Sequence, residues 1–182
     1  MKNHYDLFYD GPRLQWPGHG IFRASSGSRR SQWADRQCDP EAGPIPEGSY
    51  FLWLREDPSQ PEPTSTCNLP PTWGLQAVPR GAAAGACEPF WSAWGTNRIR
   101  LVPLDQKTRV ACQEPREGFY IHDSTKGFTH GCIEVEPKFF DLLRQSVARV
   151  ATGNAHVAKK LLLLVKYLPG QSTYGSTFKA RS

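Results

Sequence analysis

Residues 118–135 read GFYIHDSTKGFTHGCIEV and decide the fold. The apolar run that ends at His122 is typical of a strand, and a second apolar run begins just after Cys132. A polar loop that contains Gly127 lies between the two runs and indicates a turn. We therefore expect two short strands that pair through a hairpin-like loop and bring His122 and Cys132 within reach of each other.

These residues suit acyl transfer by a cysteine nucleophile. A thiol attacks acyl carbon as the thiolate, which a neighbouring imidazole generates. His130 precedes Cys132 by two residues and so lies about 6–7 Å away along an extended backbone, whereas His122 comes from a separate strand and is the expected base. Gly131 allows close approach of the substrate, and its amide and that of Cys132 are candidates for an oxyanion hole. Thr129 is expected to bond an imidazole or a loop carbonyl.

Other roles for the same residues remain open. A free cysteine often serves as a small buried apolar side chain. His122, His130 and Cys132 could also form a metal site, but the sequence offers no convincing fourth ligand. We therefore predict no metal and no cofactor.

The rest of the chain predicts a mainly β fold. A single domain is expected over residues 1–170, with a loop at 25–43, a loop excursion at 57–89 that is stapled by disulfides and a loose polar tail at 171–182. Apolar residues at helical spacing after Pro137 predict one main helix that ends near Gly153. Lys159 begins a final strand that is expected to be interior and buried on both faces. Short alternating stretches predict strands at 5–9, 14–16, 20–24, 49–54, 98–104, 118–122 and 159–167.

Charge and targeting signals narrow the class of partner. The 182-residue chain has a net charge of +5, but its basic residues are scattered apart from a cluster around Arg29 and Arg30. No nucleic-acid-binding motif accompanies them, so nucleic acid is not an expected partner. Residues 1–11 lack the apolar run of a signal peptide, and the longest apolar run, 161–165, is too short to span a bilayer. We expect synthesis in the cytoplasm and no transmembrane segment.

The chain has five cysteines, an odd number. If four of them pair, one thiol stays free, and we expect that one to be Cys132. Two disulfides among Cys38, Cys67, Cys87 and Cys112 would imply an oxidising working compartment. Three pairings are possible, and four unrelated free thiols are the alternative.

Thr129-His130-Gly131-Cys132 resembles the Ser/Thr-His-Gly-Cys signature of the L,D-transpeptidase (YkuD-like) catalytic domain. In that family a strand that ends in the catalytic histidine precedes the signature, as His122 does here. The resemblance implies a β-sandwich in which Cys132 is the nucleophile and His122 the base. It also implies that Thr129, His130 and Gly131 belong to the pocket, and Asp123, next to the expected base, is a further pocket candidate that could orient the imidazole. The chain departs from the family at Asp123, where many relatives have glycine, and at Glu134, where arginine or asparagine is frequent.

A wider similarity, to type VI secretion L,D-transpeptidase effectors, covers residues 9–11, 14–20, 24–27, 43–50, 94–98 and 118–122. It implies an antibacterial toxin that is exported by the secretion machinery into a competitor's periplasm. There it would act on peptidoglycan tetrapeptide stems as an L,D-carboxypeptidase or by D-amino-acid exchange, and a cognate immunity protein would block it in the producer.

Two more residues are weaker candidates for the site. Arg98 could bind a substrate carboxylate through its two-pronged guanidinium, and His19 could line the pocket from a glycine-rich turn. Two other functions remain open for the chain. One is a cysteine peptidoglycan amidase or endopeptidase, and the other is a non-enzymatic module that binds the cell wall.

Overall fold

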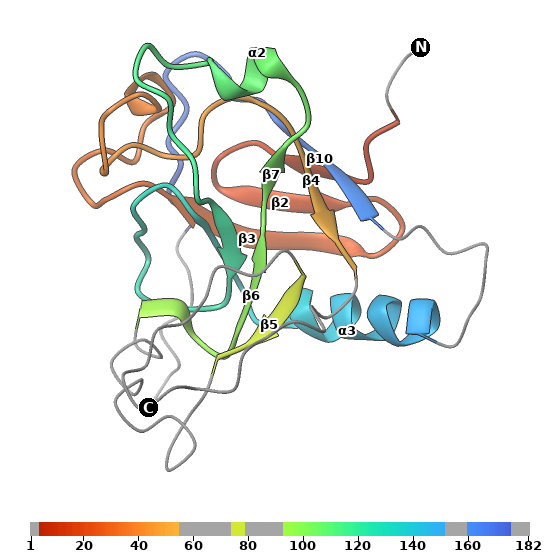
Figure 1. Ribbon diagram of the computed structural model, residues 1–182. Helices are drawn as coiled ribbons and strands as arrows, with labels where there is room; N and C mark the ends of the chain where they lie inside the picture. Colours follow the sequence, from red (N-terminus) through yellow and green to blue (C-terminus); the bar gives the residue numbers. More distant parts are fainter. Residues whose placement is uncertain (1–3, 55–73, 79–92, 152–159, 176–182) are drawn as a thin grey trace, which may run out of the picture.

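The computed structural model describes residues 4–54, 74–78, 93–151 and 160–175 (Figure 1). Within them lies one ten-stranded sheet in the order β5-β6-β8-β9-β3-β2-β1-β10-β4-β7. The strands are β1 (Leu7–Tyr9), β2 (Arg13–Trp16), β3 (Gly20–Ser26), β4 (Gly48–Trp53), β5 (Leu75–Ala77), β6 (Asn97–Arg100), β7 (Val102–Pro103), β8 (Tyr120–His122), β9 (Ile133–Val135) and β10 (Lys160–Val165). The mainly β class is confirmed, while the assignment to an L,D-transpeptidase-like sandwich stays a prediction.

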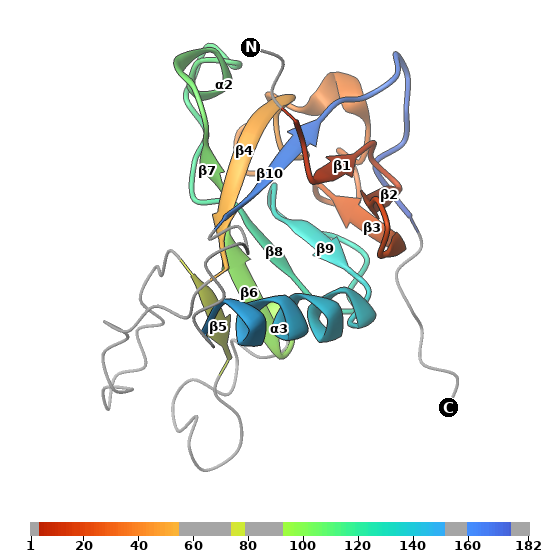
Figure 2. The ribbon, with the colours of Figure 1, turned by 90° about the vertical axis from the view of Figure 1, so that its right-hand side faces the viewer.

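β3 joins two halves of the sheet. The first half contains β2, β1, β10, β4 and β7, and the second contains β9, β8, β6 and β5. Its first residues pair with β2, and its last three, from Ala24 to Ser26, pair with β9. This change of partner lets the sheet curl so that β4 and β10 lie above β8 and β9 in Figure 2. Tyr50 of β4 and Phe119, which precedes β8, make an edge-to-face contact with ring centroids 6.4 Å apart. The core therefore fills the space between the two halves.

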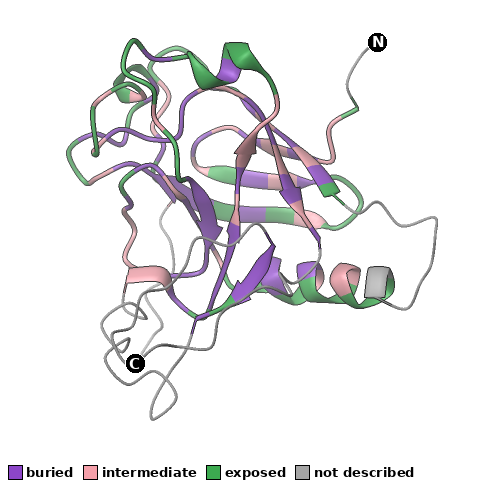
Figure 3. Cartoon of the chain, in the orientation of Figure 1, coloured by how far each residue is buried: buried purple, intermediate pink, exposed green. Residues whose placement is uncertain are grey.

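Strand register divides the second half of the sheet into an apolar face and a polar face. Neighbouring strands align the buried apolar residues Leu75, Ile99, Ile121 and Ile133. Alternate side chains of a strand point to opposite faces, so the adjacent positions form a second row on the other face. That row, here called the polar row, is at most 3% exposed and consists of Gln76, Arg98, His122 and Glu134. The strands that carry it are mostly purple in Figure 3.

β8 and β9 pair in parallel, so the expected hairpin is wrong. Ile121 aligns with Ile133 and His122 with Glu134, and both strands run in the same direction. The connecting segment must therefore return along the sheet before β9 begins. Parallel neighbours need a crossover connection. Hydrogen bonds to Glu134 and Thr129 hold the short connection between β8 and β9 in place.

β10 is an interior strand, as expected. It pairs in parallel with β1 and antiparallel with β4. Its burial nevertheless alternates: Leu161, Leu163 and Val165 are buried, whereas Leu162 and Leu164 are half-buried. The expectation of burial on both faces is therefore wrong, because one face of β10 meets the core and the other is only partly covered.

The predicted helix is α3 (Lys138–Ala151), which begins just after Pro137. Phe139, Phe140 and Leu143 are buried on its inner face. The Phe139 ring lies 5.8 Å from that of Trp16 and 5.5 Å from that of Phe22, so α3 packs on β2 and β3. The expected end at Gly153 lies outside the described residues. No helix among the described residues combines the length and the apolar character that a membrane crossing requires.

Three segments differ from the sequence-based expectation. Ser25 and Ser26, expected in a loop, belong to β3, and the same loop contains a 3-10 helix, Ala34–Arg36. The excursion at 57–89 contains β5, which pairs with β6; most of its other residues lie outside the described part. The strand expected at 98–104 is two strands, because β6 pairs with β8 while β7 pairs with β4. A four-residue helix, α2 (Gln106–Arg109), follows β7.

One predicted disulfide is present. Cys38 and Cys112 are bonded, and Cys132 is free. Cys67 and Cys87 lie outside the described residues, so a second bond stays a prediction. The observed bond joins the segment after β3 to the segment before β8 across 74 positions of sequence.

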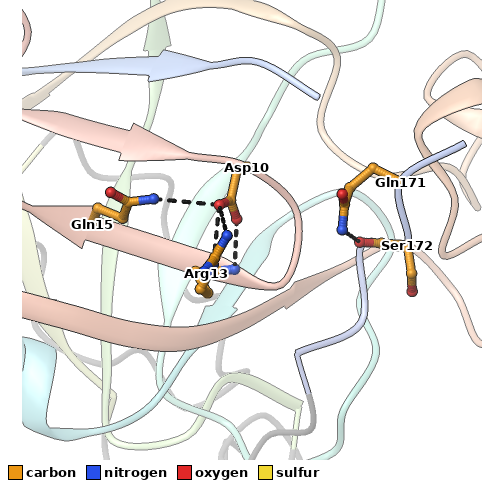
Figure 4. Close-up of polar contacts among 5 residues, drawn as sticks. All are labelled: Asp10, Arg13, Gln15, Gln171 and Ser172. Carbon is orange, nitrogen blue, oxygen red and sulfur yellow. Dashed lines mark hydrogen bonds and ion pairs between the residues drawn. The ribbon is translucent and has the colours of Figure 1, made fainter. Parts of the chain in front are cut away.

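The first residues of the polar tail are held against the fold. Thr173 is fully buried, its amide donates to the Gln32 carbonyl, and its hydroxyl donates to the Ser26 carbonyl. Figure 4 shows the neighbouring β1–β2 turn, in which the Asp10 carboxylate accepts hydrogen bonds from Arg13 and Gln15. Gly11 of that turn packs closely on residues 171–173. Tertiary contacts therefore order the start of a segment whose composition predicts a loose tail.

Candidate active site

The parallel register puts His122 and Cys132 on one face of the sheet. His122 lies opposite Glu134, and Cys132 precedes Glu134 by two positions. Residues two apart on a strand share a face, and the diagonal from His122 to position 132 on the neighbouring strand is about 7–8 Å, which an imidazole can bridge. The Tyr120 amide donates to the Cys132 sulfur over 3.4 Å, which anchors the thiol at the start of β8.

The thiol is partly buried among cations. Burial raises the pKa of Cys132 to about 11, even though the Tyr120 amide and the charges of Lys126, Arg98 and Arg116 lower it. The three cations come from separate parts of the chain. They would stabilise a thiolate once the thiol loses its proton, because opposite charges interact strongly where solvent is excluded.

His122 is neutral in this environment. Burial lowers its pKa to about 3; the charges of Lys126 and Arg98 act in the same direction, and a backbone hydrogen bond with Trp94 opposes them. Among the described residues its buried Nδ1 atom has no hydrogen-bond partner. A neutral imidazole with an unused ring nitrogen can accept a proton from a thiol or a substrate. The resting site is thus a neutral thiol near a neutral imidazole.

Thr129 and Gly131 shape the turn before Cys132. The Thr129 hydroxyl accepts from the amides of Gly27 and Gly131, each over 3.1 Å, and donates to the Cys132 carbonyl over 2.6 Å. The Gly131 amide is therefore engaged within the turn, which argues against its expected place in an oxyanion hole. Gly131 has φ +117°, and a Cβ atom there would lie 2.6 Å from the Phe119 ring. Only glycine fits this turn without displacing a neighbour.

Glu134 organises the loop between the two strands. Its carboxylate is fully buried and accepts hydrogen bonds from the Ser124 hydroxyl and from the amides of Lys126 and Gly127, the amides at 3.0 and 2.8 Å. The negative charge also attracts the half-buried Lys126. The residue at which the chain departs from the family signature thus places a cation beside the thiol.

Asp123 fastens the end of β8 to the start of β6. Its carboxylate accepts from the amides of Thr96 and Asn97 at 2.6 and 2.8 Å and from the Asn97 side chain at 2.7 Å. Gly95 is packed against it, because a Cβ atom there would lie 2.4 Å from an Asp123 carboxylate oxygen. Asp123 therefore positions the strand that carries His122, and these hydrogen bonds join its carboxylate to the start of β6 rather than to the imidazole.

Arg116 and His130 line an open cavity of about 550 Å³, whose lining does not include Cys132 or His122. The Arg116 guanidinium donates to the carbonyls of Gln37, Gly43, Pro44 and His130, and so ties the loops together. His130 is exposed, and its Nδ1 atom lies 2.7 Å from the Glu41 carbonyl. His130 thus belongs to the cavity wall. Further lining residues are Cys38, Pro40, Glu41, Glu114, Pro115, Glu117 and Phe119.

The two weaker candidates have different locations. Arg98 is buried in the polar row beside His122 and donates from Nε to the Gln76 side chain over 2.5 Å. His19 lies in the β2–β3 turn, stacked on Trp16 with ring centroids 4.2 Å apart. From Gly20, β3 runs six positions, about 20 Å, to Ser26, which lies opposite Ile133, the residue after Cys132. The structure therefore brings Arg98 to the site and leaves His19 at the far end of β3.

Sequence reasoning missed four contributors: Gln76, Arg116, Lys126 and Glu134. Gln76, Arg116 and Lys126 lie in segments without a recognisable pattern, and no sequence signal would have marked them. Glu134 carried a signal, because a charged residue inside an otherwise apolar strand needs a buried partner. The described residues contain no group of three or more side chains arranged to hold a metal ion.

Comparisons with known proteins do not identify the chain. No family model matches it, and no curated protein matches it. Among solved structures, Bd1075 of Bdellovibrio bacteriovorus is 14% identical, with a TM-score of 0.46 over 89% of this chain and 47% of that one. The chain therefore spans about half the length of this neighbour. A likeness this distant shows neither a family nor an activity.

Proposed function

We propose that the protein is a cysteine acyltransferase that acts on peptidoglycan stem peptides, as an L,D-carboxypeptidase or by D-amino-acid exchange. The observation that carries the proposal is the placement of Cys132 and a neutral, buried His122 on one sheet face, with three cations around the thiol. The Thr129–Cys132 segment and its likeness to the L,D-transpeptidase signature supply the substrate class.

The proposed reaction has two acyl-transfer steps. In the first, the thiol passes its proton to His122 while sulfur attacks the carbonyl between diaminopimelate and the terminal D-alanine. The carbon–nitrogen bond then breaks, and the imidazolium protonates the departing amine, which leaves a thioester on Cys132. In the second step, water or a D-amino acid attacks the thioester, His122 takes its proton, and the sulfur leaves and regains a proton.

The neutral resting pair indicates how the first proton moves. With thiol and imidazole pKa values near 11 and 3, a preformed thiolate–imidazolium pair is disfavoured. Proton transfer therefore accompanies attack on the carbonyl, as in general-base catalysis. The charges of Lys126, Arg98 and Arg116 stabilise the negative charge that develops on sulfur.

The biological setting belongs to the proposal as well. It comprises export by a type VI secretion machine, action in a target cell's periplasm and a cognate immunity protein. The Cys38–Cys112 disulfide suits an oxidising workplace. The amidase alternative is less favoured, because its nucleophile usually begins a helix, whereas Cys132 leads into β9.

The test uses purified, oxidised protein and disaccharide tetrapeptide muropeptides, with products followed by mass spectrometry. We expect loss of the terminal D-alanine, or its replacement when another D-amino acid is added. Cys132→Ala and His122→Ala should abolish both reactions, and His19→Ala serves as the matched histidine control. Unchanged muropeptides, or full activity of Cys132→Ala, would refute the proposal. Cleavage at another bond would favour the amidase, and retention on sacculi without cleavage would favour a wall-binding module.

A further inference from the structure

The buried guanidinium of Arg98 occupies a central position behind the reacting pair. It lies over the rings of Trp94 and Tyr120, with its central carbon 4.6 and 4.7 Å from their centroids. These two rings are themselves in edge-to-face contact, at 5.2 Å. A planar cation that packs against two aromatic rings is held in both position and orientation.

The same two residues contact His122 and Cys132. The Trp94 ring makes an edge-to-face contact with the His122 imidazole at 5.3 Å. The Tyr120 backbone amide donates to the Cys132 sulfur. Arg98 is also the direct strand partner of His122 in the polar row. The two residues whose rings contact Arg98 therefore also contact the reacting pair, Trp94 through its ring and Tyr120 through its backbone amide.

We propose that Arg98 is a positioning residue, which holds a fixed positive charge behind Cys132 and keeps the thiolate stable during attack, rather than a ligand for a substrate carboxylate. Its burial favours this role, because a guanidinium at most 3% exposed offers little surface to a substrate. Gln76 orients it from the opposite side through a neutral amide, which leaves the positive charge in place. The identity of the reaction that benefits rests on the proposed function.

Several charged groups face the thiol, so the test must separate them. Arg98 approaches from β6, Lys126 and Arg116 approach from the loops, and His122 lies on β8. A change at Arg98 alone should move the thiolate equilibrium while the other charges stay in place. Arg109, which is exposed on α2, offers a control that removes the same charge elsewhere.

The experiment measures alkylation of Cys132 by iodoacetamide from pH 7 to 10, with the labelled peptide resolved by mass. Below the pKa of the thiol, the rate follows the thiolate fraction and changes tenfold per pKa unit. Arg98→Gln should slow alkylation at pH 9 by about tenfold or more. Arg98→Lys, which keeps a positive charge but loses the planar contact with the rings, should slow alkylation less than Arg98→Gln does, and Arg109→Gln should leave the rate unchanged.

Three outcomes would overturn the inference. They are an unchanged rate in Arg98→Gln, an equal loss in Arg98→Gln and Arg98→Lys, and an equal loss in Arg109→Gln. If Arg98→Gln does not fold, Gln76→Glu decides, because a carboxylate beside Arg98 offsets its charge with little change in shape. Slower alkylation in that variant supports the role of Arg98, and an unchanged rate overturns it. Alkylation needs no muropeptide, so failure of the proposed reaction and failure of this inference are separate results.

Discussion

Replacement of Glu134 by glutamine tests the buried carboxylate that organises the site. The wild-type carboxylate accepts hydrogen bonds from the Ser124 hydroxyl and from the backbone amides of Lys126 and Gly127. A glutamine keeps one oxygen, which can still accept from Gly127. Its amide nitrogen takes the place of the second oxygen and cannot accept from Lys126, while the Ser124 hydroxyl can turn and accept from that nitrogen.

The expected loss in the free energy of unfolding follows from the hydrogen-bond acceptor that the substitution removes. One backbone amide loses its partner, which costs about 1–3 kcal/mol in a buried site, and the remaining amide bond loses its charge assistance, about 1 kcal/mol. The free energy of unfolding should therefore fall by about 2–4 kcal/mol. In guanidinium titrations followed by tryptophan fluorescence, the midpoint should fall while the slope stays constant.

Glu117→Gln is the matched control, because Glu117 is exposed near the same site. That change should stay within about 0.5 kcal/mol of the wild type. A loss of less than about 1 kcal/mol in Glu134→Gln would refute the assignment of Glu134 as the organiser of the loop. A comparable loss in Glu117→Gln would show that net charge, not the buried hydrogen bonds, sets the effect.

Three further predictions concern the turn, pH and the disulfide. Gly131→Ala should destabilise the protein by about 1–2 kcal/mol or more and slow alkylation of the thiol; wild-type values in both assays would contradict the tight turn. Since His122 has a folded pKa of about 3, below its unfolded value of 6.5, its contribution to stability is full above pH 6.5 and declines as the pH falls toward 3. Urea titrations across this range should show a shallower acid decline in His122→Gln, and identical slopes would exclude burial of His122 as the cause. Replacing Cys38 and Cys112 by serine should lower stability by about 4 kcal/mol, from the loop of about 75 residues that the disulfide closes; an unchanged unfolding midpoint would show that the bond does not constrain the unfolded chain.

The sequence by itself predicted the elements that depend on local patterns. Period-two alternation marked most strands, and three- and four-residue spacing marked α3, because each pattern follows from the geometry of its own segment. The alternation around Ile121 also assigns His122 to the face opposite the core. The residue types in the segment ending at Cys132 pointed to thiol chemistry before any contact was known.

The tertiary structure decided which segments lie side by side. Strand direction and partner depend on contacts between distant residues, so the sequence indicated a hairpin where β8 and β9 run in parallel. The cations near the thiol come from positions 98, 116 and 126, and no local period links them. Burial likewise depends on the whole fold. It keeps the His122 imidazole neutral, and it places the Glu134 carboxylate where the amides of the loop can donate to it. The local sequence thus identified Cys132 and His122 as the candidate nucleophile and base, and the packing of the two halves of the sheet decided their charge environment.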